Sequence, residues 1–154
     1  MQTREIGGKP RRACPSCGFV HFVEPKVGVG AWVEDEAQRV LLVKRGFQPE
    51  KGKWSLPAGY LDRGDDPIAH AQLEVLEETG LEVRVQALID VIRNPPEQGG
   101  ASIFILYRAH VVAGELQAGD DAVAARFFAL HELPELAFES TRRVIEHIRS
   151  RESR

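Results

Sequence analysis

Residues 56–81, LPAGYLDRGDDPIAHAQLEVLEETGL, carry the signals that decide the fold of this chain. Asp66 followed by Pro67 is typical of a helix N-cap and a first helical position, and Gly80 further along is typical of a helix end. We therefore predict a helix over residues 67–79, preceded by a glycine-bearing loop.

Three carboxylates of this helix, on Glu74, Glu77 and Glu78, fall on one face because they are spaced i, i+3 and i+4. His70 lies one turn earlier on that face. Like charges at this spacing repel, and a solvated acidic surface is the simplest interpretation. A second interpretation is a site for Mg²⁺ or Mn²⁺, which prefer hard oxygen ligands. Apolar positions are expected to border the acidic arc and keep it narrow, which favours the metal site; they are Ile68, Ala69, Ala71, Leu73, Val75 and Leu76.

The same stretch resembles the Nudix box, G-x5-E-x7-R-E-U-x-E-E-x-G-U, in which U is aliphatic. Two positions depart from the pattern, since Asp65 stands where Glu is usual and Leu73 where Arg is usual. The resemblance implies an α/β fold of the Nudix type, an α/β/α sandwich with a mixed sheet between helices. It also implies divalent-metal-dependent hydrolysis of a nucleoside diphosphate linked to another moiety. The matching positions are Gly59, Glu74, Val75, Glu77, Glu78, Gly80 and Leu81.

The resemblance also implies roles for the matching residues. Glu74 and Glu78 become the expected ligands of Mg²⁺ or Mn²⁺, with Glu77 next, and the carbonyl of Gly59 or Ala58 is expected to complete the shell. Glu77 and Glu78 are also expected to be catalytic.

A further catalytic carboxylate is expected outside the box. Glu97 is a candidate because it lies in the loop 93–100, which would cover a substrate. Asp120 and Asp121 are the other candidates, because the family usually carries Glu in a nearby segment where this chain has alanines. The identity of the general base stays open among these residues.

Leu73 has the clearest consequence for activity. An Arg at this position would orient a neighbouring carboxylate through charge-assisted hydrogen bonds, and Leu leaves the acidic face less neutralised. The alternative hypothesis is therefore a catalytically weakened module that binds a nucleotide or a protein partner without turnover.

The substrate class follows from short segments that resemble the ADP-ribose and FAD pyrophosphatase branch, namely SLPAGYLD and LAFES. The expected substrate is ADP-ribose or a dinucleotide such as FAD or NADH. Lys44 and Arg45 are candidates for binding phosphate oxygens. Phe47 and Tyr60 are candidates for an adenine shelf, with Trp32 and Trp54 considered beside them; packing in the core is the alternative for each aromatic residue.

Residues 1–24 precede the expected hydrolase domain, which spans residues 25–154. Cys14 and Cys17 have the C-x2-C spacing of a zinc knuckle and resemble half of a zinc ribbon. His21 is a third candidate ligand, and a fourth would come from elsewhere or from a second subunit. A simple thiol pair is the alternative, and residues 1–12 are expected to form a loose arm.

Alternating and valine-rich segments predict the strands. The first two are expected to pair as a hairpin, and the long strand after the box is expected to break near Gln86. A last helix should begin at Glu139 or Ser140 and bury Val144, Ile145 and Ile148. The predicted strands are residues 27–33, 40–44, 54–58, 82–92, 102–112 and 124–130, and the last helix is 141–149.

The length of 154 residues suits one domain with a real core, and the net charge of −3 argues against nucleic acid as a partner. No apolar run reaches the roughly 20 residues that span a membrane, and the N-terminus lacks the layout of a signal peptide. We expect a cytoplasmic protein whose partner is a small nucleotide. A homodimer is also an expectation, because enzymes of this branch are often dimers.

Overall fold

The computed structural model describes the backbone of residues 1–154 and every side chain except that of Gln98. The helices are α1 (Pro67–Thr79), α2 (Glu139–Glu152) and the short 3-10 helix η1 (Pro96–Gln98). The strands are β1 (Gln2–Ile6), β2 (Lys9–Ala13), β3 (Val20–His21), β4 (Val27–Val33), β5 (Val40–Arg45), β6 (Trp54–Ser55), β7 (Ala58–Tyr60), β8 (Leu81–Arg93), β9 (Ile103–Gly114) and β10 (Ala122–Phe128).

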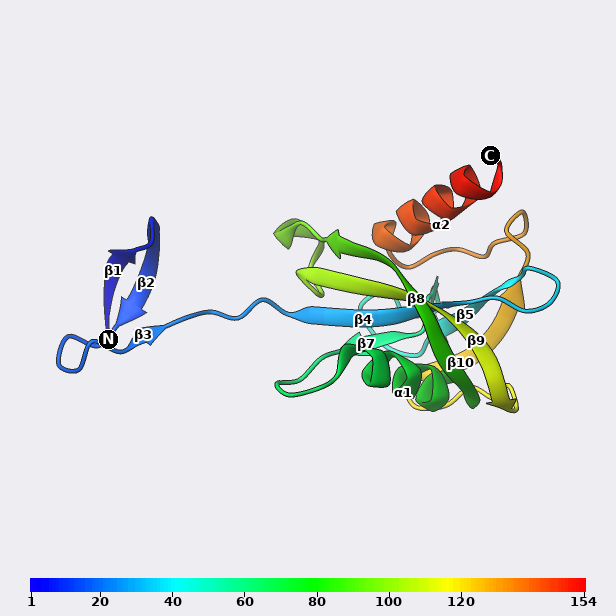
Figure 1. Ribbon diagram of the computed structural model, residues 1–154, viewed down its shortest axis with the longest axis horizontal. Coiled ribbons are helices and arrows are strands. Elements are labelled where there is room, and N and C mark those ends of the chain that lie inside the picture. The colour runs from blue at the N-terminus through cyan, green and yellow to red at the C-terminus, as the bar shows by residue number, and fades with distance from the viewer.

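The main body is a sandwich in which strands lie between α1 and α2, as Figure 1 shows. One sheet has the order β7-β4-β9-β8 and is mixed, because β4 and β9 run parallel while the other pairs are antiparallel. A second, antiparallel sheet has the order β10-β5-β6. The predicted α/β/α sandwich with a mixed sheet is therefore confirmed, with the strands divided between two sheets.

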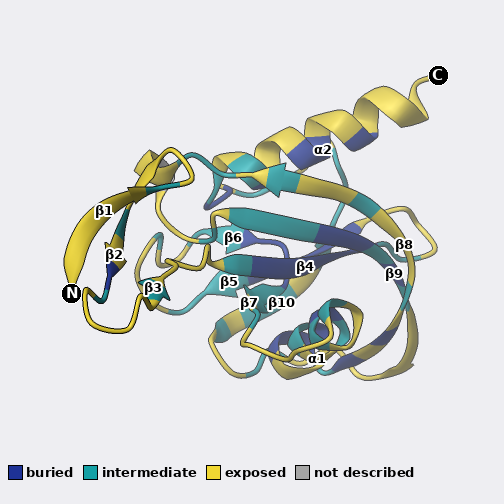
Figure 2. Cartoon of the chain, turned by 60° about the vertical axis from the view of Figure 1, so that its left-hand side comes forward, coloured by how far each residue is buried: buried dark blue, intermediate teal, exposed yellow. Residues whose placement is uncertain are grey.

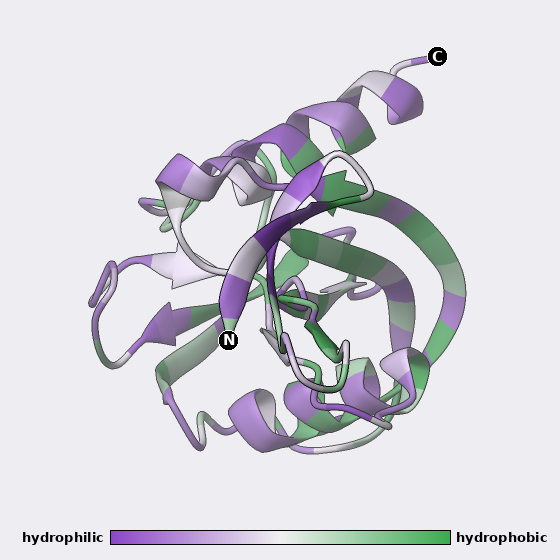
Figure 3. Ribbon diagram, turned by 90° about the vertical axis from the view of Figure 1, so that its left-hand side faces the viewer, coloured by the Kyte–Doolittle hydropathy of each residue, from purple (hydrophilic) through white to green (hydrophobic). Residues whose placement is uncertain are grey.

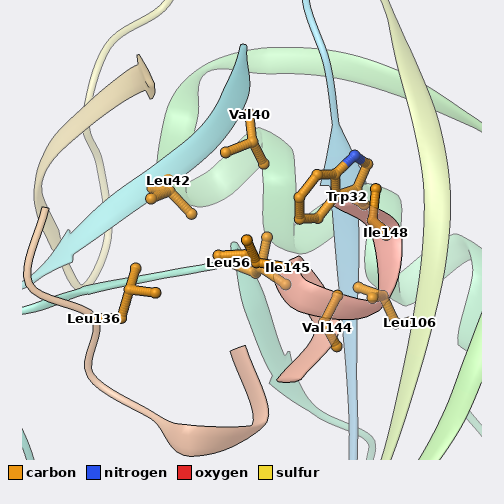
Figure 4. Close-up of a cluster of buried hydrophobic side chains, with 9 residues drawn as sticks. All are labelled: Trp32, Val40, Leu42, Leu56, Leu106, Leu136, Val144, Ile145 and Ile148. Atoms are coloured by element: carbon orange, nitrogen blue, oxygen red, sulfur yellow. The ribbon is translucent and has the colours of Figure 1, made fainter. Parts of the chain in front are cut away.

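Successive side chains of a strand point to opposite faces of its sheet, so the strands contribute apolar residues to a core on each side of the sandwich. On the α2 side, Trp32 and its neighbours pack against the helix, as Figure 4 shows. On the α1 side, Ala31 and Val33 of the same strand pack with Val75. Figures 2 and 3 show the result, with buried, hydrophobic strands in the middle and polar helix faces outside. The members of the α2-side cluster are Trp32, Val40, Leu42, Leu56, Leu106, Leu136, Val144, Ile145 and Ile148.

The boundaries of α1 agree with the sequence signals. The Asp66 carboxylate caps the helix by accepting the N–H of Ala69 at 2.8 Å. Gly80 ends the helix in the left-handed conformation with φ of +73°, and its N–H donates to the carbonyl of Leu76. The following strand, β8, is not broken near Gln86 as expected, because it runs continuously from Leu81 to Arg93. Its pairing with β9 shifts register between Val85 and Ala87, so a bulge lies at that place.

The predicted hairpin of residues 27–33 and 40–44 is wrong. The two segments meet in a single bridge between Glu34 and Val40, and then enter different sheets. Residues 28–33 and 40–43 of these strands are apolar on both faces and buried. Strands with this pattern are covered on both faces. Each of the two also lies inside its sheet and pairs with two other strands.

The expected loose arm at residues 1–12 is also wrong, because β1 and β2 pair antiparallel and β3 adds a third strand. Gly7 and Gly8 have φ of +61° and +72°, the signature of a tight hairpin turn. In Figure 1 this small sheet stands apart from the sandwich at the end of an extended segment.

Two smaller corrections concern the remaining elements. The strand expected over residues 54–58 is divided into β6 and β7, with Leu56 and Pro57 between them. The last helix runs from Glu139 to Glu152, beyond the expected end. Within the described part of the chain, neither helix has the length and apolar character needed to cross a bilayer.

Candidate active site

Glu78 is a carboxylate on the buried face of α1, with only 7% of its surface exposed. Burial raises the pKa of Glu78 to about 9, and the charge of Glu74 acts in the same direction. The backbone N–H of Ala58, at the start of β7, favours the charged form and offsets part of this effect. A buried carboxylate with so little compensation is costly in a site built for stability alone, so Glu78 marks a candidate functional site.

Glu74 lies one turn before Glu78, and its side chain is 14% exposed. The carboxylate sits directly on Gly59, where a Cβ atom would overlap it. Pairing of Val29 with Gly59 fixes this part of β7 beside β4. Burial raises the pKa of Glu74, and the charges of Glu77 and Asp120 add to the increase. The glycine that starts the box is therefore needed for the close approach of a carboxylate.

Asp120 and Asp121 lie close enough to α1 for their charges to raise the pKa of Glu78, and Asp120 acts on Glu74 as well. The loop that carries them is tied to the end of the helix, because the Gly119 N–H donates to the carbonyl of Glu78 at 3.1 Å. The aspartate pair, a weak candidate from sequence, is thus brought to the carboxylates of the box.

The carboxylates form a donor set suited to a hard divalent cation. Among the side chains that the structure describes, neither Glu74 nor Glu78 pairs with a lysine or arginine, so buried negative charge is not neutralised by a protein cation. Glu77 is exposed beside them on the same helix. In their present rotamers, no three described His, Cys, Asp or Glu side chains converge as metal ligands. The charge and chemistry of the set fit Mg²⁺ or Mn²⁺, and rotation of the solvent-exposed Glu77 side chain would complete the shell beside Glu74 and Glu78.

The apolar residues expected to border the acidic arc differ in how far they are buried. Ile68, Leu73 and Leu76 are 44%, 43% and 40% exposed. The helix instead buries Ala71, Val75, Glu78 and Thr79 against the strands. The acidic residues are therefore divided, with Glu78 facing the protein and Glu77 facing solvent.

Of the predicted substrate-binding residues, Tyr60 lies within the box segment, directly after Gly59. It follows Gly59 on β7, is 49% exposed, and has the ammonium of Lys26 at 4.7 Å from its ring centre. Gly100, from the loop that carries Glu97, approaches its hydroxyl. An exposed aromatic face with a neighbouring cation suits a nucleotide base and its phosphates.

Arg45 and Phe47 lie at the end of β5. The Arg45 guanidinium lies over Phe138 at 4.9 Å and near Phe47 at 5.6 Å, and its Nε donates to the carbonyl of Pro49 at 2.7 Å. Lys44, the other predicted phosphate ligand, is half-buried in β5 opposite Ala124. Arg45 is therefore already engaged by aromatic rings and a carbonyl.

The two tryptophans considered as adenine shelves belong to the core. Trp32 is fully buried and its indole N–H donates to the Glu34 carboxylate. Trp54 packs edge-on against Phe128 with ring centres 4.8 Å apart. Packing explains both residues without a ligand.

Glu97 is exposed in η1, and no described contact joins it to the carboxylates of α1. Its loop is tied instead to the start of β4, where the Ser102 N–H donates to the carbonyl of Lys26 at 2.8 Å. The catalytic role predicted for Glu97 stays a prediction.

Cys14 and Cys17 form a tight turn in the N-terminal sheet. The Gly18 N–H donates to the carbonyl of Cys14 at 3.0 Å, and the backbone N–H groups of Cys17 and Ser16 lower the pKa of the Cys14 thiol. His21 lies in β3 opposite Arg12. No described group of three or more His, Cys, Asp or Glu side chains completes a zinc site here. Zinc binding at this pair stays a prediction from the sequence.

His70 is the residue of the site to which sequence reasoning gave no role. Its Nε2 is 3.1 Å from Oε1 of Glu74, and its Nδ1 is 3.4 Å from Oδ2 of Asp65. The i, i+4 spacing of His70 and Glu74 was a signal for the first contact. The second depends on the loop before the helix, whose path the sequence does not reveal.

Comparison with known proteins agrees with this geometry. A family model described as the NUDIX domain matches residues 24–148. An ADP-ribose pyrophosphatase from Methanocaldococcus jannaschii is 36% identical over 129 residues, which cover 83% of this chain and 76% of that protein. A putative 8-oxo-dGTP diphosphatase from Bacillus subtilis is 29% identical over 77% of this chain and 76% of its own length.

Solved structures give the same result. The crystal structure of a Nudix hydrolase from Nitrosomonas europaea superposes with a TM-score of 0.81 at 32% identity, covering 94% of this chain and 82% of that one. The residues matched by the family model, 24–148, include the box and both helices of the sandwich up to Ile148 of α2. The chain belongs to the Nudix family and is a pyrophosphohydrolase.

Proposed function

We propose that this chain hydrolyses the pyrophosphate bond of ADP-ribose, in a reaction that depends on Mg²⁺ or Mn²⁺ and releases AMP and ribose 5-phosphate. The observation that carries the proposal is the group of buried carboxylates, Glu74 and Glu78 on α1 with Asp120 and Asp121 beside them. The ADP-ribose pyrophosphatase relative supports the choice of substrate.

Glu74 and Glu78 are the proposed metal ligands, with Glu77 and the Gly59 carbonyl completing the set. A divalent cation, when bound, would screen the phosphate oxygens and make water a better nucleophile. Its charge would also hold Glu78 in the ionised form, against the burial that now favours the protonated form. The cation would therefore offset the electrostatic cost of burying the ionised Glu78 carboxylate.

Tyr60 and Lys26 are proposed to bind the adenosine half of the substrate. The ring of Tyr60 offers a stacking surface beside Gly59, and the Lys26 ammonium lies on that ring, where it can reach a phosphate. Lys44, Arg45 and Phe47 are proposed as a second contact region. The engagement of Arg45 with Phe138 favours a packing role over a direct phosphate contact.

The proton acceptor for the attacking water is proposed to be a carboxylate outside the metal pair. Asp121 is favoured because its charge acts on Glu78, whereas no described contact joins Glu97 in η1 to the carboxylates of α1. Asp121 and Glu97 are both candidates for the general base, and a comparison of their variants distinguishes them.

The test is a substrate panel of ADP-ribose, FAD, NADH and 8-oxo-dGTP with Mg²⁺ or Mn²⁺, read as release of AMP or pyrophosphate. We expect turnover of ADP-ribose to be the fastest. Faster turnover of 8-oxo-dGTP would place the substrate with the second relative. Tight calorimetric binding without product would support the weakened-module alternative.

A further inference from the structure

The imidazole of His70 lies between two carboxylates, one at each ring nitrogen. Glu74 Oε1 is 3.1 Å from Nε2, and Asp65 Oδ2 is 3.4 Å from Nδ1. His70 is only 18% exposed, so both contacts are sheltered from bulk water. Nε2 is fully buried and its contact with Glu74 is not aligned as a good hydrogen bond in the described structure. The ring is therefore aimed at a carboxylate that the rest of the site does not neutralise.

Asp65 is itself held in place by the loop before α1. Its Oδ2 accepts the backbone N–H of Asp62 at 2.8 Å, and its own N–H donates to the carbonyl of Asp62 at 3.1 Å. A continuous set of contacts thus runs from the loop backbone through Asp65 and His70 to Glu74. Such outer contacts orient metal-binding side chains and fix their direction.

Leu73 leaves space in this region. A pocket of about 180 Å³ is lined by Asp65, Asp66, Ala69, His70 and Leu73. The Leu73 side chain is 43% exposed and supplies no charge to the two aspartates. An arginine at this position would extend along a pocket that already has two carboxylates on its wall.

We propose that His70 is a positioning residue, which holds Glu74 in the orientation needed for metal binding by joining it to Asp65. It performs the orienting task for which Leu73 has no functional group. This inference rests on the proposed metal-dependent function, because Glu74 is one of the proposed ligands.

The physical reason is the freedom of an unanchored glutamate. Glu74 has several rotatable bonds, and the charges of Glu77 and Asp120 repel it. The imidazole, with Nε2 at 3.1 Å from Oε1 of Glu74, is placed to restrict these rotamers and to offset the repulsion before a cation arrives. Without the imidazole, metal binding would be weaker, because the entropy lost in ordering the Glu74 side chain would oppose it.

Four variants of the full chain test the proposal. His70→Ala removes both contacts, while His70→Gln keeps a donor near the place of Nε2. The double variant His70→Ala with Leu73→Arg supplies a cation from the neighbouring pocket. His131→Gln is the control, since His131 is 79% exposed and lies beside its neighbour Glu132. Mn²⁺ affinity is measured by electron paramagnetic resonance without substrate, and kcat and KM for ADP-ribose are measured at saturating metal.

We expect His70→Ala to weaken Mn²⁺ binding by about tenfold, with little change in KM for ADP-ribose once metal is saturating. His70→Gln and the Leu73→Arg double variant should each recover much of the Mn²⁺ affinity, and His131→Gln should match the wild type. Wild-type Mn²⁺ affinity in His70→Ala, or no recovery in the double variant, would overturn the proposal.

The same measurements separate this inference from the proposed function. The Mn²⁺ titration does not depend on the choice of substrate, so failure to hydrolyse ADP-ribose leaves the role of His70 testable. If the wild-type protein binds no Mn²⁺ at all, the metal-dependent function itself fails.

Discussion

The carboxylate of Glu74 occupies the space in which Gly59 would carry a side chain. The two residues come from different elements, since Gly59 belongs to β7 and Glu74 to α1. The first glycine of the box therefore lets a helix carboxylate rest on the backbone of a strand, in the space that a side chain would occupy.

Replacement of Gly59 by Ala should displace the Glu74 side chain, because the new Cβ would overlap it. We expect Mn²⁺ affinity to fall by about tenfold or more. The control is the same substitution in a Glu74→Ala background, where it should add little to the loss already present. Equal effects of Gly59→Ala in both backgrounds would show that it acts by some route other than Glu74.

The stability of the metal-free protein should fall as pH rises. The pKa of Glu78 is raised to about 9 in the folded chain from the ordinary 4.5, so the folded state holds a proton that the unfolded state releases. This contribution is complete below pH 4.5 and is lost as pH rises toward 9, with a slope of at most about 1.4 kcal/mol per pH unit.

Urea denaturation in a chelator, at several pH values between 5.5 and 8.5, measures this slope. The Glu78→Gln variant should show a shallower dependence because it cannot ionise. Added Mg²⁺ should stabilise the wild type more at the higher pH. Identical slopes for the two proteins would mean that Glu78 ionises normally in the folded chain.

The general base can be identified by comparing Asp121→Asn with Glu97→Gln. We expect Asp121→Asn to lower kcat by more than about tenfold, in the range of general-base contributions, because Asp121 acts electrostatically on Glu78. Glu97→Gln should have the smaller effect, because no described contact joins Glu97 in η1 to the carboxylates of α1. A larger loss of kcat in Glu97→Gln than in Asp121→Asn would assign the general base to the loop 93–100.

Tyr60 should contribute to substrate affinity through its exposed ring. Base stacking is worth about 1–3 kcal/mol when removed by alanine, so Tyr60→Ala is expected to raise KM for ADP-ribose about tenfold with kcat nearly unchanged. Tyr60→Phe keeps the ring and is the matched control. Equal KM values for the wild type and Tyr60→Ala would rule out stacking on this residue.

The N-terminal sheet should be dispensable for turnover. It buries Ala13 but leaves Phe19, Phe22 and Val23 exposed at 61%, 58% and 82%. Its linker is tied to the box loop by an exposed ion pair of Glu24 and Arg63, which contributes little. A chain that lacks residues 1–24 should keep kcat and lose at most a few degrees in Tm. Loss of turnover in a folded truncation would show that the sheet helps to form the site.

The parts of the fold that the sequence predicted correctly are those with local signals. Asp66, Pro67 and Gly80 mark the ends of α1 through capping chemistry that acts within one turn. Periodicity likewise found the buried side of α2. Pairing between distant strands has no such local signal, and both β4 and β5 read as ordinary hairpin strands because their burial on two faces depends on the whole sandwich.

The candidate site was predictable to the same extent. The box register identified Glu74 and Glu78, and the structure shows them buried next to Gly59. The contact of His70 with Asp65 depends on how the preceding loop folds back. The approach of Asp121 to α1 depends on a turn more than 40 residues later in the chain, which no local pattern links to the helix.

The requirement for Glu78 in hydrolysis is measured by AMP release from ADP-ribose with Mg²⁺, compared between the wild type, Glu78→Gln and the exposed-carboxylate control Glu82→Gln. We predict steady turnover by the wild type and the control, and a loss of more than about a hundredfold in Glu78→Gln, the scale expected when a key electrostatic group is removed. Wild-type activity in Glu78→Gln would show that hydrolysis does not depend on the buried carboxylate of the box helix.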